Sequence, residues 1–280
     1  MINFFHRQIP NPILFSFGPI NIYWYGFCII IGIILAMLVI LKLSKYYKIN
    51  QEVIFDLIFY LMLAGIIGAR IYDVLLEFSY YAEHPINIFK IWQGGLAIHG
   101  GIIAGIITLW IFSKKQKLNF WKITALAVSV MPLAQAMGRW GNYFNNELFG
   151  LPTSAPWGIP VLPENKIMEF YDYSFFHPTF LYESIGNLII FIFLIVLNIW
   201  MIRSKKMKNI YYQIILSTYL ILYSLLRFSL EFIRIDITPS FIGFRIPQIA
   251  SMIIILVVVI FWIVKYYKIL KQRHINAKNI

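Results

Sequence analysis

The chain has 280 residues, of which 60% are hydrophobic and only 13% are charged, and its mean hydropathy is +0.73. Soluble domains are about one quarter charged, so this composition excludes an ordinary soluble globular protein. The formal net charge of +12 invites the hypothesis of a nucleic-acid partner, which the placement of the charges then tests.

Seven apolar blocks follow one another along the chain. A hydrocarbon core of roughly 30 Å requires about 20 consecutive apolar residues in a helix, so each block predicts a membrane-spanning helix. The predicted fold class is therefore all-α, a polytopic membrane protein with about seven transmembrane helices, with residues 1–280 forming a single integral membrane domain. The predicted helices cover residues 20–43, 53–77, 95–113, 120–137, 179–202, 210–232 and 246–268.

Basic residues gather in every second connection and at the C-terminal end. Sixteen of the 24 basic residues lie there, and only Glu52 and Asp56 of the 12 acids are near them. Cytoplasmic loops retain Lys and Arg, so the N-terminus is predicted outside and the C-terminus in the cytoplasm. The charge then has a topological origin, and no nucleic-acid partner is expected. These residues are Lys42, Lys45, Lys48, Lys114, Lys115, Lys117, Lys122, Arg203, Lys205, Lys206, Lys208, Lys265, Lys268, Lys271, Arg273 and Lys278.

In this orientation, nearly all ionisable residues inside or beside the blocks, apart from the basic segments and the two acids near them, fall toward the outer ends. A charge at membrane depth costs about 2.5–3.5 kcal/mol and normally faces a bundle interior or a wet cavity. Several such residues at one level predict a functional site. They are Arg70, Asp73, Glu77, His99, Arg139, Glu183, Arg227 and Glu231. The aromatic run Tyr23–Tyr25 lies at the same level, where it could also be an interfacial belt.

Some of these residues have a purely structural alternative. Arg70 with Asp73 and Arg227 with Glu231 are spaced i,i+3 and i,i+4, so each pair could be a self-contained ion pair. His99 alone could be a helix-packing histidine. The glycines around it leave space beside the imidazole, but they also suit close helix packing. They are Gly94, Gly95, Gly100, Gly101 and Gly105.

The stretch 138–150 has a density of amide and charged side chains that helix packing does not require. The segment that follows, 151–178, contains no long apolar block and five prolines, so it predicts a compact outer loop. Such a loop could shield the site, help to hold a second substrate, or only connect two helices.

These residues resemble the prolipoprotein diacylglyceryl transferase family. Its signature Gly-Arg-x-Gly-Asn-Phe-x-Asn-x-Glu-x-x-Gly matches residues 138–150, except that Tyr143 stands in place of the phenylalanine. A second departure is Ala125, where members of the family often carry an acid. Further similar stretches are Trp24-Tyr25-Gly26, Gly94-Gly95, His99-Gly100-Gly101, His177-Pro178, Leu181-Tyr182-Glu183 and Tyr223 through Arg227 to Glu231.

The resemblance implies transfer of a diacylglyceryl group from phosphatidylglycerol to the lipobox cysteine of a prolipoprotein signal peptide. It also implies a bacterial inner (plasma) membrane, in which the charge topology predicts the site near the outer leaflet. A thiol nucleophile benefits from a base, and a phosphate leaving group benefits from guanidinium groups. We therefore expect the catalytic residues to be His99, Arg139 and Arg227, although His99 could instead only hydrogen-bond the lipid. The expected substrate-binding residues are Tyr25, Asn142, Glu147, Gly150, Tyr223 and Glu231.

Two rival functions predict features that the sequence does not display. A lipid transporter is expected to have repeated halves with broken helices, and no internal repeat is evident. A headgroup phosphotransferase would need clustered aspartates for a divalent metal, which Asp73 and Glu77 do not supply. The single cysteine, Cys28, has an apolar context and offers no thiolate metal site or disulfide. No cofactor or metal is expected.

Overall fold

The computed structural model describes residues 9–18, 20–204 and 208–278. The chain divides into two compact units. Unit 1 contains the described residues of Met1–Ala36, Val128–Ser204 and Ile214–Ile280, and unit 2 contains those of Met37–Ala127 and Lys205–Gln213. Of the basic residues that predicted the topology, Lys205 and Lys206 lie outside the described residues, as do the side chains of Arg273 and Lys278.

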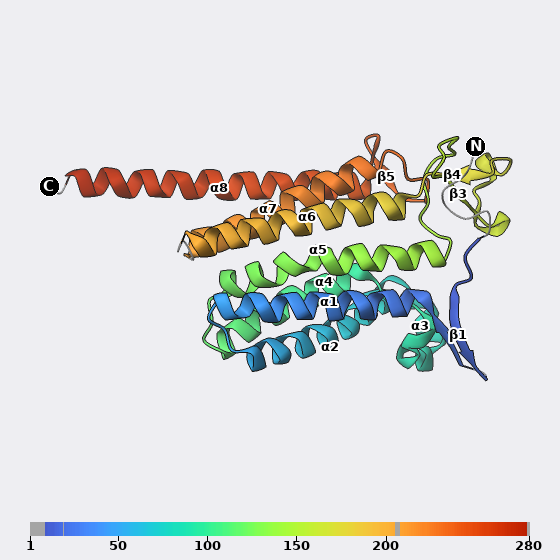
Figure 1. The fold of residues 1–280 in the computed structure, drawn as a ribbon, viewed down its shortest axis with the longest axis horizontal. Coiled ribbons are helices and arrows are strands. Elements are labelled where there is room, and N and C mark those ends of the chain that lie inside the picture. Colours follow the sequence, from blue (N-terminus) through green and yellow to red (C-terminus); the bar gives the residue numbers. More distant parts are fainter. Residues whose placement is uncertain (1–8, 19, 205–207, 279–280) are drawn as a thin grey trace. The chain divides into compact units, whose positions relative to one another are not determined.

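A long helix occupies each of the seven predicted apolar blocks (Figure 1). They are α1 (Trp24–Tyr46), α2 (Gln51–Leu76), α4 (Ile98–Lys115), α5 (Phe120–Phe144), α6 (Thr179–Arg203), α7 (Asn209–Leu230) and α8 (Ile246–Lys278). Six of them, all except the 18-residue α4, are long and apolar enough to cross a membrane. A helical, polytopic membrane protein is thereby confirmed, while the count of seven spans, the orientation and the single domain stay predictions.

The fifth helix in the chain corrects one predicted boundary. α5 continues to Phe144, whereas the apolar block predicted an end at residue 137. The prediction was wrong because hydropathy marks where a helix leaves the hydrocarbon, and the residues after 137 are polar but still helical. As a result Arg139 and Asn142 lie on a rigid helix and not on a loop.

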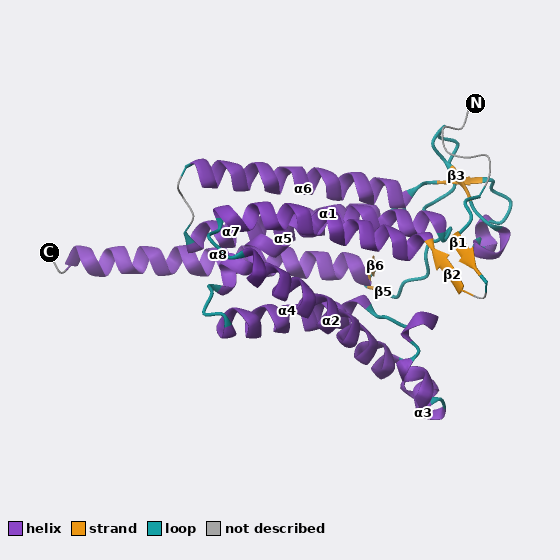
Figure 2. Ribbon diagram, turned by 60° about the horizontal axis from the view of Figure 1, so that its bottom comes forward, coloured by secondary structure: helices purple, strands orange, loops and turns teal. Residues whose placement is uncertain are grey.

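Short strands and one short helix also depart from the predicted pattern (Figure 2). β1 (Ile13–Phe17) and β2 (Ile20–Tyr23) form an antiparallel hairpin, so the first helix begins at Trp24 and not at residue 20. A short apolar run has no periodicity that separates strand from helix. Two further antiparallel strand pairs and a helix also occur. They are β3 (Ile159–Pro160) with β4 (Phe175–Phe176), β5 (Ser240–Phe241) with β6 (Phe244–Arg245), and α3 (Phe78–Glu83).

Polar contacts tie α5 to α6 within unit 1. The Ser184 hydroxyl donates to the Ala136 carbonyl at 2.9 Å, and the Asn198 amide donates to the Ser129 hydroxyl at 2.9 Å. Both are buried. Helices in a bilayer gain little from apolar burial alone, so hydrogen bonds of this kind help to fix their register. They also fix how the end of α5 meets the start of α6.

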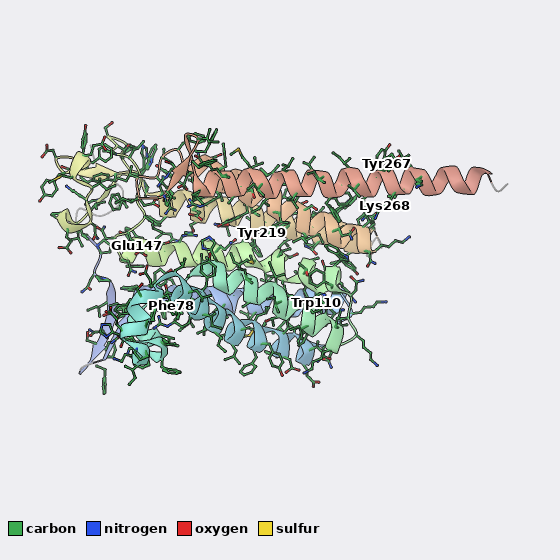
Figure 3. All side chains as sticks on the ribbon, turned by 180° about the vertical axis from the view of Figure 1, so that it is seen from behind. Phe78, Trp110, Glu147, Tyr219, Tyr267 and Lys268 are labelled. Atoms are coloured by element: carbon green, nitrogen blue, oxygen red, sulfur yellow. The ribbon has the colours of Figure 1, made fainter. Side chains whose placement is uncertain are left out.

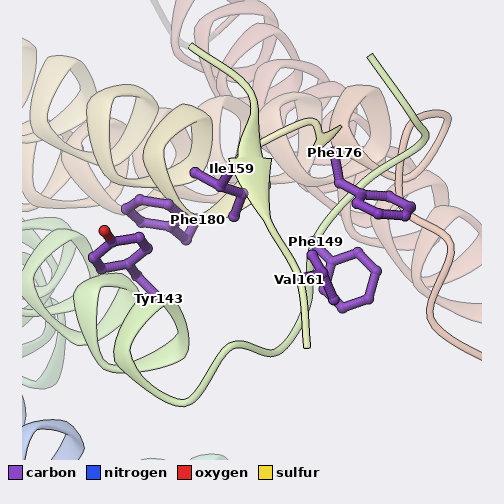
Figure 4. Packing of buried hydrophobic residues seen from close by; sticks show 6 residues of the cluster. All are labelled: Tyr143, Phe149, Ile159, Val161, Phe176 and Phe180. Atoms are coloured by element: carbon purple, nitrogen blue, oxygen red, sulfur yellow. The ribbon is translucent and has the colours of Figure 1, made fainter. Parts of the chain in front are cut away.

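The segment 151–178 packs with the end of α5 and the start of α6 in one apolar cluster (Figure 4). The Tyr143 and Phe180 rings stack at 4.7 Å, and the Phe149 and Phe176 rings meet edge to face at 5.1 Å. The segment contains only short strands and the 3-10 turns η3 (Pro163–Asn165) and η4 (Met168–Phe170), and its place as an outer loop stays a prediction. The buried members of the cluster are Tyr143, Phe149, Ile159, Val161, Phe176 and Phe180.

A chain of three polar side chains holds the start of α6 to this segment. The Trp157 indole donates to the Tyr182 hydroxyl at 2.7 Å, and that hydroxyl lies 2.9 Å from Nδ1 of His177. Burial lowers the pKa of His177, which favours a neutral imidazole. A neutral ring can accept a hydrogen bond from the Tyr182 hydroxyl at Nδ1, and the chain of hydrogen bonds is then complete.

In unit 2, α2 and α4 approach each other closely at two glycines. A Cβ on Gly68 would lie 2.6 Å from the Gly100 carbonyl oxygen, and a Cβ on Gly100 would lie 2.1 Å from that of Gly68. Both distances are far inside van der Waals contact. Of the two explanations for the glycines beside His99, close helix packing is therefore confirmed at Gly100.

Candidate active site

Arg139, near the end of α5, is paired with a buried carboxylate from the start of α6. Its Nε lies 3.0 Å from Oε1 of Glu183, whose side chain is only 2% exposed. The Arg139 side chain is 22% exposed, so part of the guanidinium remains accessible. A buried carboxylate of this kind fixes the plane of the guanidinium without using all of its donors.

Arg227, in the last turn of α7, has a corresponding arrangement. Its Nη1 lies 2.7 Å from Oε2 of Glu231, and Oε1 of the same carboxylate lies 3.1 Å from Nε of Arg245. The Glu231 side chain is fully buried, whereas about one fifth of each arginine is exposed. The predicted i,i+4 pair is present, but it is part of a larger network and not self-contained.

Arg234, in the loop after α7, joins these two arrangements. It lies 3.6 Å from Oε2 of Glu183, and its Nε donates to Asp236 at 2.8 Å. The Asp236 carboxylate also faces Arg245 at 3.6 Å. Burial by itself raises the pKa of Asp236, but hydrogen bonds and charge from Arg234, together with Thr238 and Arg245, outweigh burial and lower it.

We call Arg139, Arg227, Arg234 and Arg245 the arginine cluster. Its four guanidinium groups face three carboxylates, those of Glu183, Glu231 and Asp236, which leaves one positive charge in excess. Each carboxylate bridges two arginines, so the guanidinium groups are held apart at fixed positions. Such a preorganised cationic site suits an anion with several oxygens, such as a phosphate.

A second set of polar side chains extends from Arg139 past the end of α5. The Arg139 guanidinium donates to Oδ1 of Asn142 at 3.1 Å, and the Asn142 amide donates to Glu147 at 2.7 Å. Asn142 is buried, whereas Glu147 is exposed (labelled in Figure 3). Tyr25, at the start of α1, interacts electrostatically with both Arg139 and Glu147. This places three predicted substrate-binding residues beside one predicted catalytic arginine.

Close backbone packing sets the positions of two of these residues. A Cβ on Gly141 would lie 2.5 Å from the Tyr25 ring, so only glycine allows that ring to approach α5. A Cβ on Gly150 would lie 2.7 Å from the Ile233 carbonyl oxygen, one residue before Arg234. Gly150 thus holds the loop that carries Arg234, and its substrate-binding role stays a prediction. Tyr223, the remaining predicted binding residue of α7, interacts with Arg139 and Arg227.

His99 belongs to unit 2, where it lies in the first turn of α4. The side chain is exposed and its ring lies 5.8 Å from that of Tyr72. The backbone just before it is fixed, because the Ala97 amide donates to the Ala69 carbonyl of α2 at 3.1 Å. An exposed imidazole on a fixed helix end is available to a substrate, and its role as a base stays a prediction.

Arg70, also in unit 2, has a structural role. It lies 3.6 Å from Asp73 and over the Tyr81 ring at 4.9 Å, and its guanidinium donates to four backbone carbonyls. These are the carbonyls of Asn87, Ile88, Gly94 and Gly95. Because Arg70 is buried and its donors are used in this way, it anchors the loop before α4. The predicted pair with Asp73 is present, but it is not self-contained.

Arg234 and Arg245 were not among the predicted site residues, although the sequence contains a signal for them. Eight basic residues lie outside the segments that set the topology, and six of these are arginines. Inside those segments 14 of the 16 are lysines. Lysine is sufficient for topology, whereas a site that binds anions through paired donors favours arginine. Over residues 9–18, 20–204 and 208–278, no group of three His, Cys, Asp or Glu side chains could hold a metal ion.

Removing the Glu183 charge is expected to destabilise the fold. In Glu183→Gln, two arginines lose a shared carboxylate, and breaking a buried pair costs about 3–5 kcal/mol. We expect about 3 kcal/mol, because the Arg139 side chain is 22% exposed. Denaturant unfolding of the purified protein in detergent measures this. The control Glu164→Gln changes an exposed acid and should stay within about 0.5 kcal/mol. Equal stability of both variants would contradict the prediction.

Comparison with known proteins supports the resemblance seen in the sequence. A family model described as prolipoprotein diacylglyceryl transferase matches residues 12–264. A phosphatidylglycerol--prolipoprotein diacylglyceryl transferase from Fervidobacterium nodosum is 42% identical over 90% of this chain and 84% of its own length. A protein of the same name from Synechocystis sp. is 41% identical over 89% of this chain and 87% of its own length. The chain therefore belongs to the prolipoprotein diacylglyceryl transferase family.

Proposed function

We propose that this protein transfers the diacylglyceryl group of phosphatidylglycerol to the lipobox cysteine of a prolipoprotein. The peptide sulfur forms a bond to the diacylglyceryl carbon while the bond from that carbon to the phosphate oxygen breaks. The products are a thioether-linked lipoprotein precursor and glycerol phosphate. The observation that carries this proposal is the arginine cluster, whose excess positive charge suits a phosphate leaving group.

In this proposal the two partly exposed arginines at the ends of α5 and α7 act on the phosphate. Arg139 and Arg227 bind its oxygens and stabilise the negative charge that develops as the carbon–oxygen bond breaks. Glu183 and Glu231 orient them through the ion pairs described above. Asn142, Tyr25 and Tyr223 lie beside Arg139, where they can hydrogen-bond the headgroup.

His99 takes the proton of the substrate thiol. A thiol with a pKa near 8.5 is mostly protonated at neutral pH, so transfer to an imidazole in the transition state lowers the barrier. Its exposed position at the start of α4 supports this role. Cys28 is buried within α1, so we do not assign it a role as nucleophile.

The protein lies in the bacterial plasma membrane, with its N-terminus outside, its C-terminus in the cytoplasm and seven spans. The alternating basic segments support this orientation, since α1, α4 and α6 each end in a basic turn. The arginine cluster then lies near the outer leaflet, because it is built from the ends of α5 and α7 and the starts of α6 and α8.

The test is reconstitution of the purified protein with phosphatidylglycerol and a lipobox peptide. We expect the peptide to gain the mass of one diacylglyceryl group, and we expect no gain when serine replaces the cysteine or when phosphatidylethanolamine replaces phosphatidylglycerol. An unmodified cysteine peptide with folded protein would contradict the proposal. Movement of labelled lipid between leaflets without peptide modification would favour the transporter instead.

A further inference from the structure

A cavity of about 310 Å³ adjoins the polar side chains at the end of α5. Its lining comes from three segments, namely the stretch after α5, the turn η3 with the residues after it, and the loop between α7 and β5. The lining residues are Asn146, Glu147, Leu148, Phe149, Asn165, Ile167, Ile235, Asp236 and Ile237. Asp236 also pairs with Arg234 and Arg245 in the arginine cluster, and Glu147 is an expected substrate-binding residue. The other lining residues have no role in the reaction proposed above.

Hydrogen bonds of Asn146 hold the walls of this cavity in place. The Asn146 side chain donates to the Pro160 carbonyl at 3.1 Å and accepts from the Leu162 amide at 2.7 Å. Asn165 donates to the Asn146 carbonyl at 2.9 Å. Asn146, which takes part in all three hydrogen bonds, is 4% exposed, whereas Asn165 is exposed.

The backbone on either side of Glu147 is held in a conformation that side chains rarely adopt. Asn146 has φ of 52° and Leu148 has φ of 54°, both in the left-handed region. Non-glycine residues remain there only where the surrounding structure requires it. With this backbone conformation, the polar side chain of Glu147 and the apolar side chain of Leu148 both line the cavity.

The chemistry of the lining points to a peptide and not to a lipid. The carboxylate of Glu147, which has no cation partner among the ion pairs described above, disfavours a phosphate, and it also disfavours an acyl chain, which offers it no donor. The volume is at the low end of the range of roughly 300–1,000 Å³ for small-ligand pockets, too small for a diacylglycerol lipid. Ile237, at 95% exposure, adds an apolar side chain that has no cover within the described residues.

An extended peptide can satisfy both kinds of lining residue. An apolar side chain fits against Leu148, Ile167 and Ile235, and backbone N–H groups can donate to Glu147. Two amides, those of Asn142 and Asn145, donate to Oε1 of Glu147. Within the described residues no hydrogen bond reaches its Oε2. A bound peptide would therefore sit against the same carboxylate that is linked through Asn142 to Arg139.

We propose that this cavity binds an apolar side chain of the prolipoprotein peptide, close in sequence to the cysteine that reacts. This inference rests on the proposed function, since it assigns a recognition site to the second substrate. An extended chain advances about 3.3 Å per residue, so a side chain bound here lies within a few residues of a thiol placed beside Arg139. The cavity then selects the peptide and sets its register.

The test compares a variant that fills the cavity with a matched variant beside it. Ile167→Trp should raise KM for the lipobox peptide by about tenfold or more, with KM for phosphatidylglycerol unchanged. Met168→Trp, at a neighbouring position that is 93% exposed and outside the lining, should leave both values unchanged. An unchanged peptide KM in Ile167→Trp, or an increase only in the phosphatidylglycerol KM, overturns the proposal.

A second variant removes the risk that tryptophan disturbs the fold. Ile237→Ser alters a side chain that is almost fully exposed, and we expect about threefold weaker binding of a fluorescent lipobox peptide measured by anisotropy without lipid. Because no reaction occurs in that assay, it tests the cavity even if transfer fails. Peptide binding without transfer would contradict the proposed function alone, and transfer with unaltered binding in both variants would contradict the cavity alone.

Discussion

Arg139→Lys is expected to lower kcat/KM for phosphatidylglycerol by about 10²–10³-fold. Lysine keeps the positive charge opposite Glu183 but cannot offer two parallel donors to a phosphate. Loss of one preorganised donor typically costs about 2.7–4 kcal/mol of transition-state stabilisation. The rate of peptide modification, measured by mass spectrometry over a range of lipid concentrations, gives the change directly.

The control for this substitution is Arg203→Lys. Arg203 is exposed at the end of α6 and belongs to the basic segments that set the topology. Its replacement should leave the rate within about twofold, because topology depends on charge and not on guanidinium geometry. If Arg139→Lys has full activity and a normal melting temperature, Arg139 does not bind the leaving phosphate.

His99→Gln is expected to lower kcat/KM for the peptide by about 10²–10⁴-fold at pH 7, the usual contribution of a general base. Glutamine keeps a hydrogen-bonding side chain in the first turn of α4 but cannot accept the thiol proton. The control is His84→Gln, since His84 is the exposed residue that ends α3 and has no assigned role. Its activity should match that of the unaltered protein.

The pH dependence of His99→Gln separates the two roles considered for His99. With a thiol pKa near 8.5, the thiolate fraction of the peptide rises roughly twentyfold between pH 7 and pH 9. A missing base then matters less, so the deficit of the variant relative to unaltered protein should shrink by about tenfold. A deficit that is the same at both pH values would show that His99 only hydrogen-bonds the lipid.

The positions of the helices followed from the sequence, because each apolar block must match the thickness of a bilayer. The errors fell where that constraint ends. Residues 20–23 form β2 and not the start of a helix, and α5 runs on to Phe144 through polar residues. At both places local hydrogen bonding and contacts with other segments decide the structure, and hydropathy carries no information about either.

Two ion pairs that look alike in the sequence proved to be different. Arg70 with Asp73 and Arg227 with Glu231 have similar helical spacing, and both pairs form. Arg70 is buried and donates to backbone carbonyls, so it holds a loop. Arg227 stays partly exposed, and its partner Glu231 is shared with Arg245. Spacing along one helix predicts a pair, but the surroundings of the pair depend on segments far away in the chain.

The sequence by itself determined the membrane environment, the helical fold and the residues of the family motif, including Arg139, Asn142 and Glu147. Composition, block length and the motif are properties of the chain as written, so no folding is needed to read them. Only the tertiary structure decided that Glu183 is shared by Arg139 and Arg234, and that Arg245 completes the arginine cluster. These partners lie on different helices and loops, and they meet because a buried carboxylate requires cations from whichever segments the fold brings to it.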